Sequence, residues 1–555
     1  MQFLWVIVAI VVVCLGHMAR AQESRFIQAA RHLPKIETAL RQERPDFDPP
    51  AGVTGITVPH HLLAADLIAR GVWAASARQP KRILLLSPDH PRDLETPFGV
   101  TTAPLDAETG PVPPDPAISD ALLVHRDLFT DTGNVPIEHG VHSVTPFLAS
   151  VFPGVPVAAV TSGKTAGPTD WARLADILEP LIAPDTLIVQ STDYSHHLPQ
   201  SVAVLRDQET LSILSTGDAS AALALNQPAH LDSLASQWLM TELQTRVHAA
   251  SPVIIANRSS ARYAPGAPEQ GTTSYVVAAW SADAGAGSAL RYDDQDVLWF
   301  GGDVMTGRGM IPVLSDPQRL AAMVQAVQAI TGGAPLLVNL EGALLPERPI
   351  GAHSAQHWLP PAVTRPALRG MGVTAVSLAN NHAGDFGPIG TEMTAEALLA
   401  MDIMPMFHAE VVDLGPVRIL PLTFRRSYFA EHDVIRTGDQ LAQACDVEAR
   451  PPVVAFVHWG GDYTATPDRE VEEATRILRD CGITAVIGAH GHVASDAPDA
   501  PMAGGILRVT SLGNLIFDQM ADVSGALAEL RVFEQGTVAL RLVPVPNFFD
   551  AQRLD

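Results

Sequence analysis

The stretch that most constrains the fold lies between Val453 and Val493. It holds two apolar runs, VVAFVHWGGDY and TAVIGAHGHVA, and each run ends in glycine and histidine. This pattern is typical of a buried strand whose carboxyl end delivers polar side chains. Neutral imidazoles held at rigid strand ends are well suited to bind a metal ion, although a single histidine there can equally fill the core or the surface. The candidate ligands are His458, His490 and His492, with Gly488 and Gly491 allowing close approach of the backbone.

Three further apolar runs in this half of the chain end in the same way. WFGGDVMTGRGM places Asp303 at a strand end, LLVNLEGALL places Asn339 and Glu341, and TAVSLANNHAGDFG places Asn380, Asn381 and His382. A centre of two metal ions needs this mixture, because ions about 3.5–4 Å apart share a bridging carboxylate and one oxygen nucleophile. The five strand ends together therefore predict a dinuclear metal site.

Length and composition set the class of protein. A chain of 555 residues is too long for one ordinary core, so two or three domains are expected. With 47% hydrophobic and 17% charged residues, the chain is not dominated by disorder. The net charge of −24 and the absence of a Lys/Arg cluster exclude nucleic acid as a partner. An acidic surface suits divalent cations or cationic partners, or serves solubility alone.

The N-terminus predicts export. An apolar run from Phe3 to Leu15 precedes Ala19-Arg20-Ala21, the order of a signal peptide cleaved after Ala21. Because no Lys or Arg precedes the run, an uncleaved signal anchor remains an alternative and would be the only membrane contact. Either way the expected location is periplasmic or membrane-anchored, facing the extracytoplasmic side. Beyond the signal, Cys445 and Cys481 form one disulfide or stay two thiols, with equal expectation.

The predicted organisation is a signal segment (1–21), a helical segment (22–51), an α/β domain (52–280), a Gly-rich linker (281–296) and a second α/β domain (297–555). In the first α/β domain, strands alternate with helices, which implies a mainly parallel sheet. The expected strands are Ile83–Leu86, Val155–Val160, Leu187–Gln190, Val253–Ala256 and Ser274–Ala279, and the expected helices are His61–Ala75, Asp170–Leu181 and Arg206–Leu214.

Polar residues also gather at the strand ends of the first domain, within VPHH, LLLSPDHPR, EHGVHSVTPFL and QSTDYSHHLP. The carboxyl ends of parallel strands form the usual ligand crevice of an open α/β sheet. A helix cap or a satisfied core group is the alternative for each residue alone. The clustered residues are His60, His61, Asp89, His90, Glu138, His139, His142, Asp193, His196 and His197.

These motifs resemble those of the Memo-like family, also named AmmeMemoRadiSam system protein B, whose fold is similar to class III extradiol dioxygenases. The resemblance implies that His60, His90 and His196 line a metal or substrate pocket, with Asp193 and Glu138 as polar supports. It also implies one bound iron, copper or zinc, and activity as an oxygenase or redox enzyme. Because no cysteine lies between Cys14 and Cys445, a thiolate-ligated site is excluded.

The ordered set GGD, NLE, LANNH, HWG, GAHGH and SLGNLIFD is similar to the CapA/PgsA family of capsule and poly-γ-glutamate synthesis proteins. The resemblance implies a metallophosphoesterase-like, four-layer α-β-β-α sandwich and two divalent ions, Mn, Fe or Zn. By position, Asp303 and His492 bind the first ion, Asn381, His458 and His490 bind the second, Glu341 bridges them and His382 is the general acid. Arg308 and Asn380 are the candidate substrate-binding residues, and a surface salt bridge is the alternative for Arg308.

Two departures from that pattern leave the activity open. Val304 and Met305 follow Asp303 where metallophosphoesterases carry Asp-x-His, and Ala489 replaces one imidazole of the GHHPH pattern. The first expectation is an exported hydrolase acting on a cell-envelope polymer or phosphoester. The second is a non-catalytic accessory protein that binds polymer or the subunits of capsule or polyglutamate synthesis. A third is oxygenase or redox chemistry in the first domain.

Overall fold

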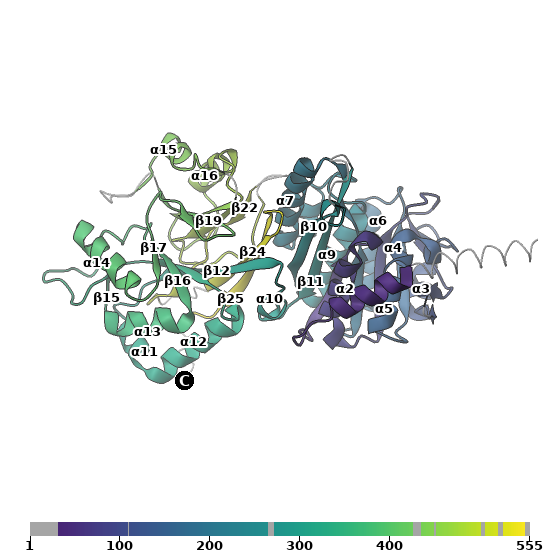
Figure 1. Ribbon diagram of the computed structural model, residues 1–555, viewed down its shortest axis with the longest axis horizontal. Helices are drawn as coiled ribbons and strands as arrows, with labels where there is room; N and C mark the ends of the chain where they lie inside the picture. Colours follow the sequence, from purple (N-terminus) through teal and green to yellow (C-terminus); the bar gives the residue numbers. More distant parts are fainter. Residues whose placement is uncertain are drawn as a thin grey trace, which may run out of the picture. The chain divides into compact units, whose positions relative to one another are not determined.

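The computed structural model describes residues 32–108, 110–264, 271–425, 434–448, 451–500, 506–519 and 525–549 (Figure 1). The chain divides into two compact units. Unit 1 comprises the residues up to Asp193 and Ala235–Leu243, and unit 2 comprises Tyr194–Leu234 and the residues from Gln244 onward. The predicted signal or anchor lies outside the described residues. Among the described residues, no helix has the length and apolar character to cross a membrane.

The protein is a mixed α/β protein with several sheets, as expected, and unit 1 contains a mainly parallel one. Its strands lie in the order β1 (Val53–Val58), β8 (Thr186–Ser191), β2 (Arg82–Pro88), β7 (Val157–Ser162), β3 (Phe98–Val100) and β6 (Phe129–Asp131). β1, β8, β2 and β7 pair in parallel, and β3 pairs antiparallel with β7. The remaining elements are η1 (Leu62–Ala64), α2 (Ala65–Ala74), η2 (Ser76–Arg78), β4 (Leu105–Asp106), β5 (Pro111–Val112), α3 (Pro116–Leu123), η3 (Val135–Ile137), α4 (His139–His142), α5 (Thr145–Val151), α6 (Pro168–Leu178) and η4 (Glu179–Leu181). A helix over residues 32–42 precedes them.

Unit 2 begins with an antiparallel set of strands and ends with two larger sheets. In the first set, β11 (Thr272–Ser281) pairs with β10 (Ser251–Ser259) and with β9 (Tyr194–Leu198). The accompanying helices are α7 (Gln200–Thr216), α8 (Ala219–Ala222), η5 (Ser260–Arg262) and α10 (Ala286–Ala289), while α9 (Leu234–His248) contributes to both units.

The two larger sheets carry the strand ends predicted to form the metal site. One has the order β17 (Met404–Met406), β16 (Val373–Ser377), β13 (Leu336–Leu340), β12 (Gln295–Val304), β24 (Gly525–Phe533) and β25 (Val538–Val545), with β23 (Asn514–Ile516) beside β12. The other has the order β18 (Val412–Asp413), β19 (Arg418–Phe424), β20 (Val453–Trp459), β21 (Ala485–Ala489) and β22 (Leu507–Val509). The remaining elements are α11 (Met310–Ser315), α12 (Pro317–Thr331), β14 (Ala343–Leu344), β15 (Trp358–Leu359), α13 (Pro361–Met371), α14 (Gly387–Leu399), α15 (Gly438–Ala444) and α16 (Arg469–Asp480).

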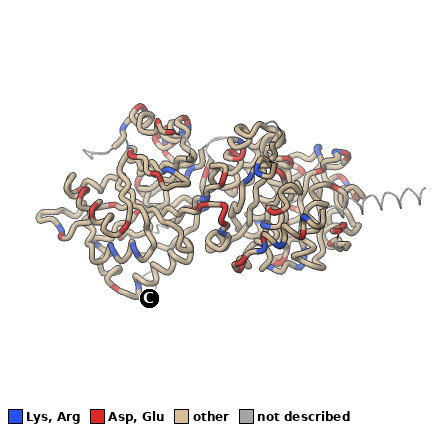
Figure 2. The backbone as a smooth tube through the Cα atoms, viewed as in Figure 1, with Lys and Arg blue, Asp and Glu red and all other residues tan. Residues whose placement is uncertain are grey.

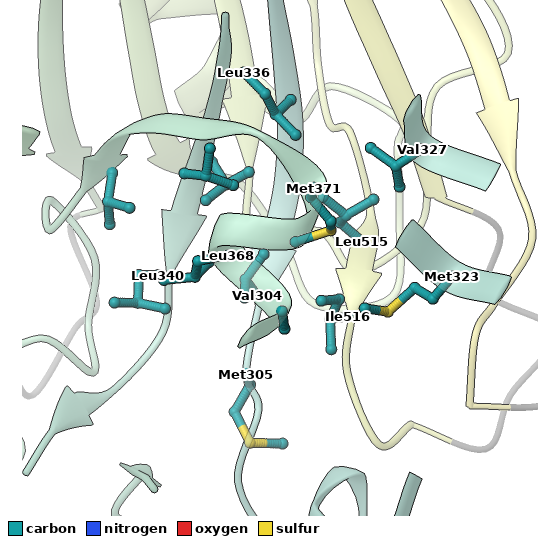
Figure 3. Close-up of a cluster of buried hydrophobic side chains, with 14 of the residues drawn as sticks. Val304, Met305, Met323, Val327, Leu336, Leu340, Leu368, Met371, Leu515 and Ile516 are labelled. Carbon is teal, nitrogen blue, oxygen red and sulfur yellow. The ribbon is translucent and has the colours of Figure 1, made fainter. Parts of the chain in front are cut away.

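Alternate residues of β12 point into two different cores, as the pleat of a strand requires. Trp299 belongs to a buried cluster with residues of α11, α12 and α13, part of which Figure 3 shows around Met323, Leu368 and Ile516. Phe300 belongs to a second cluster built from both sheets, where its ring meets that of Phe456 edge to face at 5.5 Å. A third cluster joins the other side of β19, β20 and β21 to α15 and α16.

Two features of unit 2 concern segments singled out in the sequence. Cys445 and Cys481, which cap the C-terminal ends of α15 and α16, form a disulfide, and this decides between the two predicted states. The segment predicted to be a linker contains α10, where Gly287 and Leu290 are buried and their carbonyls accept hydrogen bonds from Arg531. Figure 2 shows acidic residues spread along both units and interleaved with Lys and Arg.

Candidate metal centre

The register of the strands brings the predicted ligands of unit 2 to one edge of each sheet. β12 and β13 run parallel with Asp303 beside Asn339, and β20 and β21 run parallel with His458 beside Ala489. The main-chain N–H of His490 donates to both carboxylate oxygens of Asp303, at 3.3 and 3.1 Å, which ties the two sheets together at this edge. Asp303, Asn339, His458 and His490 are each at least nine-tenths buried, and Asn381 is half-buried.

Asp303, Glu341 and His492 form the first group of potential metal ligands. Their ligand atoms lie within 4.8 Å of one another. Nδ1 of His492 lies 3.3 Å from Asp303 Oδ2 and 2.9 Å from the amide oxygen of Asn514. Burial raises the pKa of the Asp303 carboxyl, but the hydrogen bond from His492 and the charge of that ring outweigh burial and lower it below its ordinary value.

Glu341, His458 and His490 form a second group, again with ligand atoms within 4.8 Å of one another. Nε2 of His458 lies 2.9 Å from the amide oxygen of Asn381, which brings the fourth predicted ligand to the same place. Burial and the neighbouring imidazoles lower the pKa of His458 well below its ordinary value, and burial lowers the pKa of His490 to about 4. Both rings are therefore neutral at pH 7, which is the form that ligates a metal.

Glu341 is the residue that the two groups share. Burial and the nearby Asp303 carboxylate raise the pKa of Glu341 well above its ordinary value. Asn339 supports this arrangement, since its amide nitrogen lies 2.8 Å from Asp303 Oδ1, 3.4 Å from Glu341 Oε1 and 3.2 Å from His458 Nδ1. Carboxylate, amide and imidazole donors without a thiolate suit Mn, Fe or Zn in the divalent state, so the residues fit the predicted ions.

His382 lies beside this site in a network that the sequence did not predict. Its Nδ1 lies 3.0 Å from Asp385 Oδ2, and its ring stacks on that of His357 with centroids 3.6 Å apart. Glu341, His357 and His382 also bring their ligand atoms within 4.8 Å. Two stacked imidazoles direct their lone pairs within separate, nearly parallel planes, so this arrangement suits hydrogen bonding better than ligation of one ion.

Arg308 fixes the hydrogen bonding of His357. A guanidinium group can only donate, so Nη1 of Arg308 donates to Nε2 of His357 at 3.1 Å, and Nδ1 of His357 donates to the carbonyl of Glu341 at 3.2 Å. The same guanidinium forms a fork with Asp518, at 3.2 and 2.5 Å. This ion pair corresponds to the salt-bridge alternative for Arg308. The binding of a substrate by Arg308 stays a prediction.

The side chain of Asn380 makes its hydrogen bonds within the protein, to its own turn and to the neighbouring strand end. Its amide nitrogen donates to Asn339 Oδ1 at 3.0 Å and to the carbonyl of Leu340 at 2.9 Å. Its amide oxygen accepts from the main-chain N–H groups of His382 and Ala383. Asn380 therefore shapes the turn that presents Asn381 and His382, and contact with a substrate stays a prediction.

Several residues of the site were not singled out from the sequence. They are His357, Asp385, Arg425, Asp462 and Asn514. Asp385 lies within the motif NNHAGD and Asn514 lies within SLGNLIFD, so their closeness to the predicted site residues in the sequence could have indicated them. His357 and Arg425 stand outside any strand-end motif, and only the fold brings them to the site.

In unit 1, the structure brings together four of the five residues predicted for the N-terminal pocket. The ring centroids of His60 and His90 are 5.1 Å apart, and His139 lies 5.3 and 5.8 Å from them. Nδ1 of His90 contacts Glu138 Oε1, and the main-chain N–H of His60 donates to Asp193 Oδ1 at 3.0 Å. Burial and the two neighbouring imidazoles lower the pKa of His139 to about 4.

His196, the fifth predicted residue, belongs to unit 2. It lies on β9, where its Nε2 is 3.7 Å from Asp232 Oδ2 and its Nδ1 is 3.5 Å from the hydroxyl of Thr273. His139 was predicted to lie among the polar residues of the ligand crevice, but it was not one of the five residues predicted to line the pocket. Its position one residue after Glu138, at the start of α4, was the available signal.

The chain matches two protein-family models. The model described as Memo-like protein matches residues 31–234, and the model described as Bacterial capsule synthesis protein PGA_cap matches residues 297–406 and 422–519. Among solved structures, TT1561 of Thermus thermophilus is 14% identical and covers 45% of this chain and 98% of its own, with a TM-score of 0.27. The uncharacterized protein JW3007 from Escherichia coli K12 is also 14% identical and covers 40% of this chain and 99% of its own, with a TM-score of 0.29.

Two curated relatives match part of the chain. Capsule biosynthesis protein CapA of Bacillus anthracis is 29% identical over 206 residues, covering 32% of this chain and 49% of the relative. PGA biosynthesis protein CapA of Bacillus subtilis (strain 168) is 24% identical over 292 residues, covering 48% of this chain and 76% of the relative. The chain thus spans about half the length of the first relative. Both resemblances seen in the sequence are confirmed, and the chain joins a region that matches the Memo-like model to a region that matches the PGA_cap capsule synthesis model.

Proposed function

We propose that unit 2 carries a dinuclear-metal hydrolase centre of the phosphoesterase type, in an exported protein of capsule or poly-γ-glutamate synthesis. The observation that carries the proposal is the position of Glu341 in both ligand groups. Asp303 and His492 would hold one ion, Asn381, His458 and His490 would hold the other, and Glu341 would contact both. The names of the curated relatives support a role in the synthesis of an envelope polymer.

Two bound divalent ions would supply a hydroxide nucleophile near neutral pH and would neutralise charge on a phosphate-like group. The chain's own residues do the rest. Asn339 orients Asp303, Glu341 and His458 through a single amide nitrogen. The Nδ1–H group of His382 donates a hydrogen bond to Asp385. Nε2 is therefore the nitrogen that exchanges a proton with the leaving oxygen of the substrate.

A non-catalytic accessory role is the second candidate, and one observation favours it. Met305 stands where related phosphoesterases carry a metal-binding histidine, and its side chain is fully buried in the apolar cluster of Figure 3. A protein with a weak first metal site would bind polymer or synthesis subunits without turnover. The Memo-like pocket of unit 1 would serve that role, or would hold one iron, copper or zinc through His60 and His90.

The Glu341→Gln variant tests the catalytic proposal. Burial and the Asp303 carboxylate raise the pKa of Glu341 well above its ordinary value, and glutamine has the same shape without the charge, so the amide should preserve the fold. We expect the variant to lose bound metal and at least about 100-fold in kcat, because a metal centre contributes several kcal/mol to the transition state. The measurements are elemental analysis and turnover on a panel of phosphomonoesters and phosphodiesters.

Asp207→Asn is the matched control, because Asp207 is also a fully buried carboxyl of unit 2 with a raised pKa. It should retain wild-type metal content and turnover. Equal metal content in wild type and Glu341→Gln would reject the dinuclear centre. Metal uptake by the wild type without turnover of any ester would reject the hydrolase and support the accessory role.

A further inference from the structure

Arg425 lies at the edge of the candidate metal centre although no strand-end motif contains it. It directly follows β19, which pairs in parallel with β20 so that Thr423 lies beside His458. The main-chain N–H of Arg425 donates to the carbonyl of Ile435 at 3.1 Å, which fixes the start of the side chain. The same strand-end geometry that presents His458 therefore presents Arg425.

The guanidinium of Arg425 occupies the acceptor nitrogen of His490. Nη1 of Arg425 lies 2.6 Å from Nε2 of His490. Arginine can only donate, and a neutral imidazole has one nitrogen that accepts. Nε2 of His490 is therefore the acceptor, and its proton is on Nδ1.

This contact and metal ligation by His490 exclude one another. If Nε2 binds the ion, Arg425 has to leave that nitrogen. If Nδ1 binds the ion, the ring proton has to move to Nε2, which then donates and repels the guanidinium. Asp462 is placed to accept a hydrogen bond from that N–H group, since its Oδ1 lies 3.3 Å from Nε2 of His490.

Once released, Arg425 stays next to the site because its main chain is held by Ile435. Its side chain is 22% exposed and lies 4.0 Å from the half-exposed Asp462, so it can reach solvent and an incoming ligand. A guanidinium fork beside bound metal ions matches two oxygens of a phosphate group.

We propose that Arg425 is an exchangeable partner of this site, which holds His490 in the metal-free protein and binds the phosphate group of the substrate once His490 ligates a metal ion. The proposal rests on the metal centre proposed above and adds an anion-binding residue to it. It predicts an order in which the metal binds first and phosphate second, because metal binding releases the anion-binding group.

Titration calorimetry of the full-length chain tests the proposal, first with Mn²⁺ and then with inorganic phosphate on the Mn²⁺-loaded protein. Arg425→Met should bind Mn²⁺ more tightly than wild type, because a competitor for His490 is gone. It should bind phosphate about 10- to 100-fold more weakly, the effect of losing a charge-assisted hydrogen bond. Arg425→Lys should recover part of the phosphate affinity, since it restores the charge without the fork.

Arg479→Met is the control for the loss of one positive charge, because Arg479 pairs with Asp480 on α16. It should match wild type in both titrations. If wild type takes up Mn²⁺ but Arg425→Met binds Mn²⁺ and phosphate as wild type does, this inference is overturned and the metal centre stands. If the wild type takes up no Mn²⁺, both are overturned.

Discussion

Asp385 determines which nitrogen of His382 can take part in proton transfer. It accepts from Nδ1 of His382 at 3.0 Å and also from the main-chain N–H of His357 at 2.6 Å. The main chain of His357 thus fixes the carboxylate of Asp385, and this carboxylate orients the ring of His382. His357 stacks on the same ring and limits its rotation. The proposed general acid is therefore positioned by side chains from two separate loops.

The Asp385→Asn variant should affect substrates according to their leaving group. For an alkyl phosphoester, whose leaving oxygen needs a proton, we expect kcat to fall about 10- to 100-fold, within the usual effect of general acid catalysis. For a p-nitrophenyl ester, which needs little protonation, kcat should fall less than about threefold. His382→Ala should repeat this pattern, and an equal loss on both substrates would remove His382 from the acid role.

At the same scale, the sequence selected the candidate ligands that the structure brings together, but it did not select the residues that surround them. Asp303, Glu341, His458, His490 and His492 lie in the last residues of apolar strands or just after them, so a local pattern was enough to select them. His357 reaches the site because β15 pairs with β14, and Arg425 reaches it because β19 pairs with β20. No local pattern carries that information, because the contact depends on register and loop path.

At the scale of elements, two glycines explain why the strand ends can meet. A Cβ on Gly488 would lie 1.9 Å from the carbonyl oxygen of Thr510 and 2.5 Å from Nε1 of Trp459. A Cβ on Gly491 would lie 2.2 Å from the carbonyl oxygen of Thr464. The prediction that these glycines allow close approach of the backbone is confirmed.

Gly488→Ala should therefore destabilise the protein by about 1–3 kcal/mol, the usual cost of overpacking. Trp459 donates to the Thr510 carbonyl at 2.9 Å, and the added methyl group would separate them. A lower midpoint in chemical denaturation checks this. Gly285→Ala is the control, since its nearest neighbour atoms lie at ordinary distances of 3.5 and 3.8 Å. Equal midpoints for the two variants would contradict the account.

The expected strands and helices of the first domain exist, with shifted ends. β7 begins at Val157 because Pro156 lacks the N–H that a strand needs, and α6 ends at Leu178 shortly before Pro180. β1 was missed, since Thr54 and Gly55 interrupt its apolar run. Periodicity thus located buried elements well, and it failed where polar or small residues lie inside a strand.

At the scale of the whole molecule, the two family regions do not correspond to separately packed parts of the chain. α7, from the Memo-like region, packs against β25, from the C-terminal part of unit 2. Gln208 exchanges hydrogen bonds with both main-chain polar groups of Val538, and Ser215 accepts from the N–H of Leu540. The buried Asp207 accepts from Gln535 at 2.8 Å. These contacts cover the edge of the larger sheet.

A fragment of residues 297–555 should therefore be unstable, although it contains every ligand of the proposed metal centre. Without α7, the main-chain groups of β25 lose their partners, and an exposed edge strand promotes association. We expect the fragment to aggregate or to lack a cooperative unfolding transition, as measured by size-exclusion chromatography and thermal denaturation. A monomeric fragment with the same unfolding transition as the full chain would show that α7 contributes nothing.

The positions of bound metal ions would show whether unit 2 holds a dinuclear centre at Glu341. Crystals of the full-length protein soaked in Mn²⁺ would be measured for anomalous scattering. A dinuclear centre shared by Glu341 should give two peaks about 3.5–4 Å apart, one on either side of the Glu341 carboxylate. A single peak, or peaks away from Glu341, would contradict it.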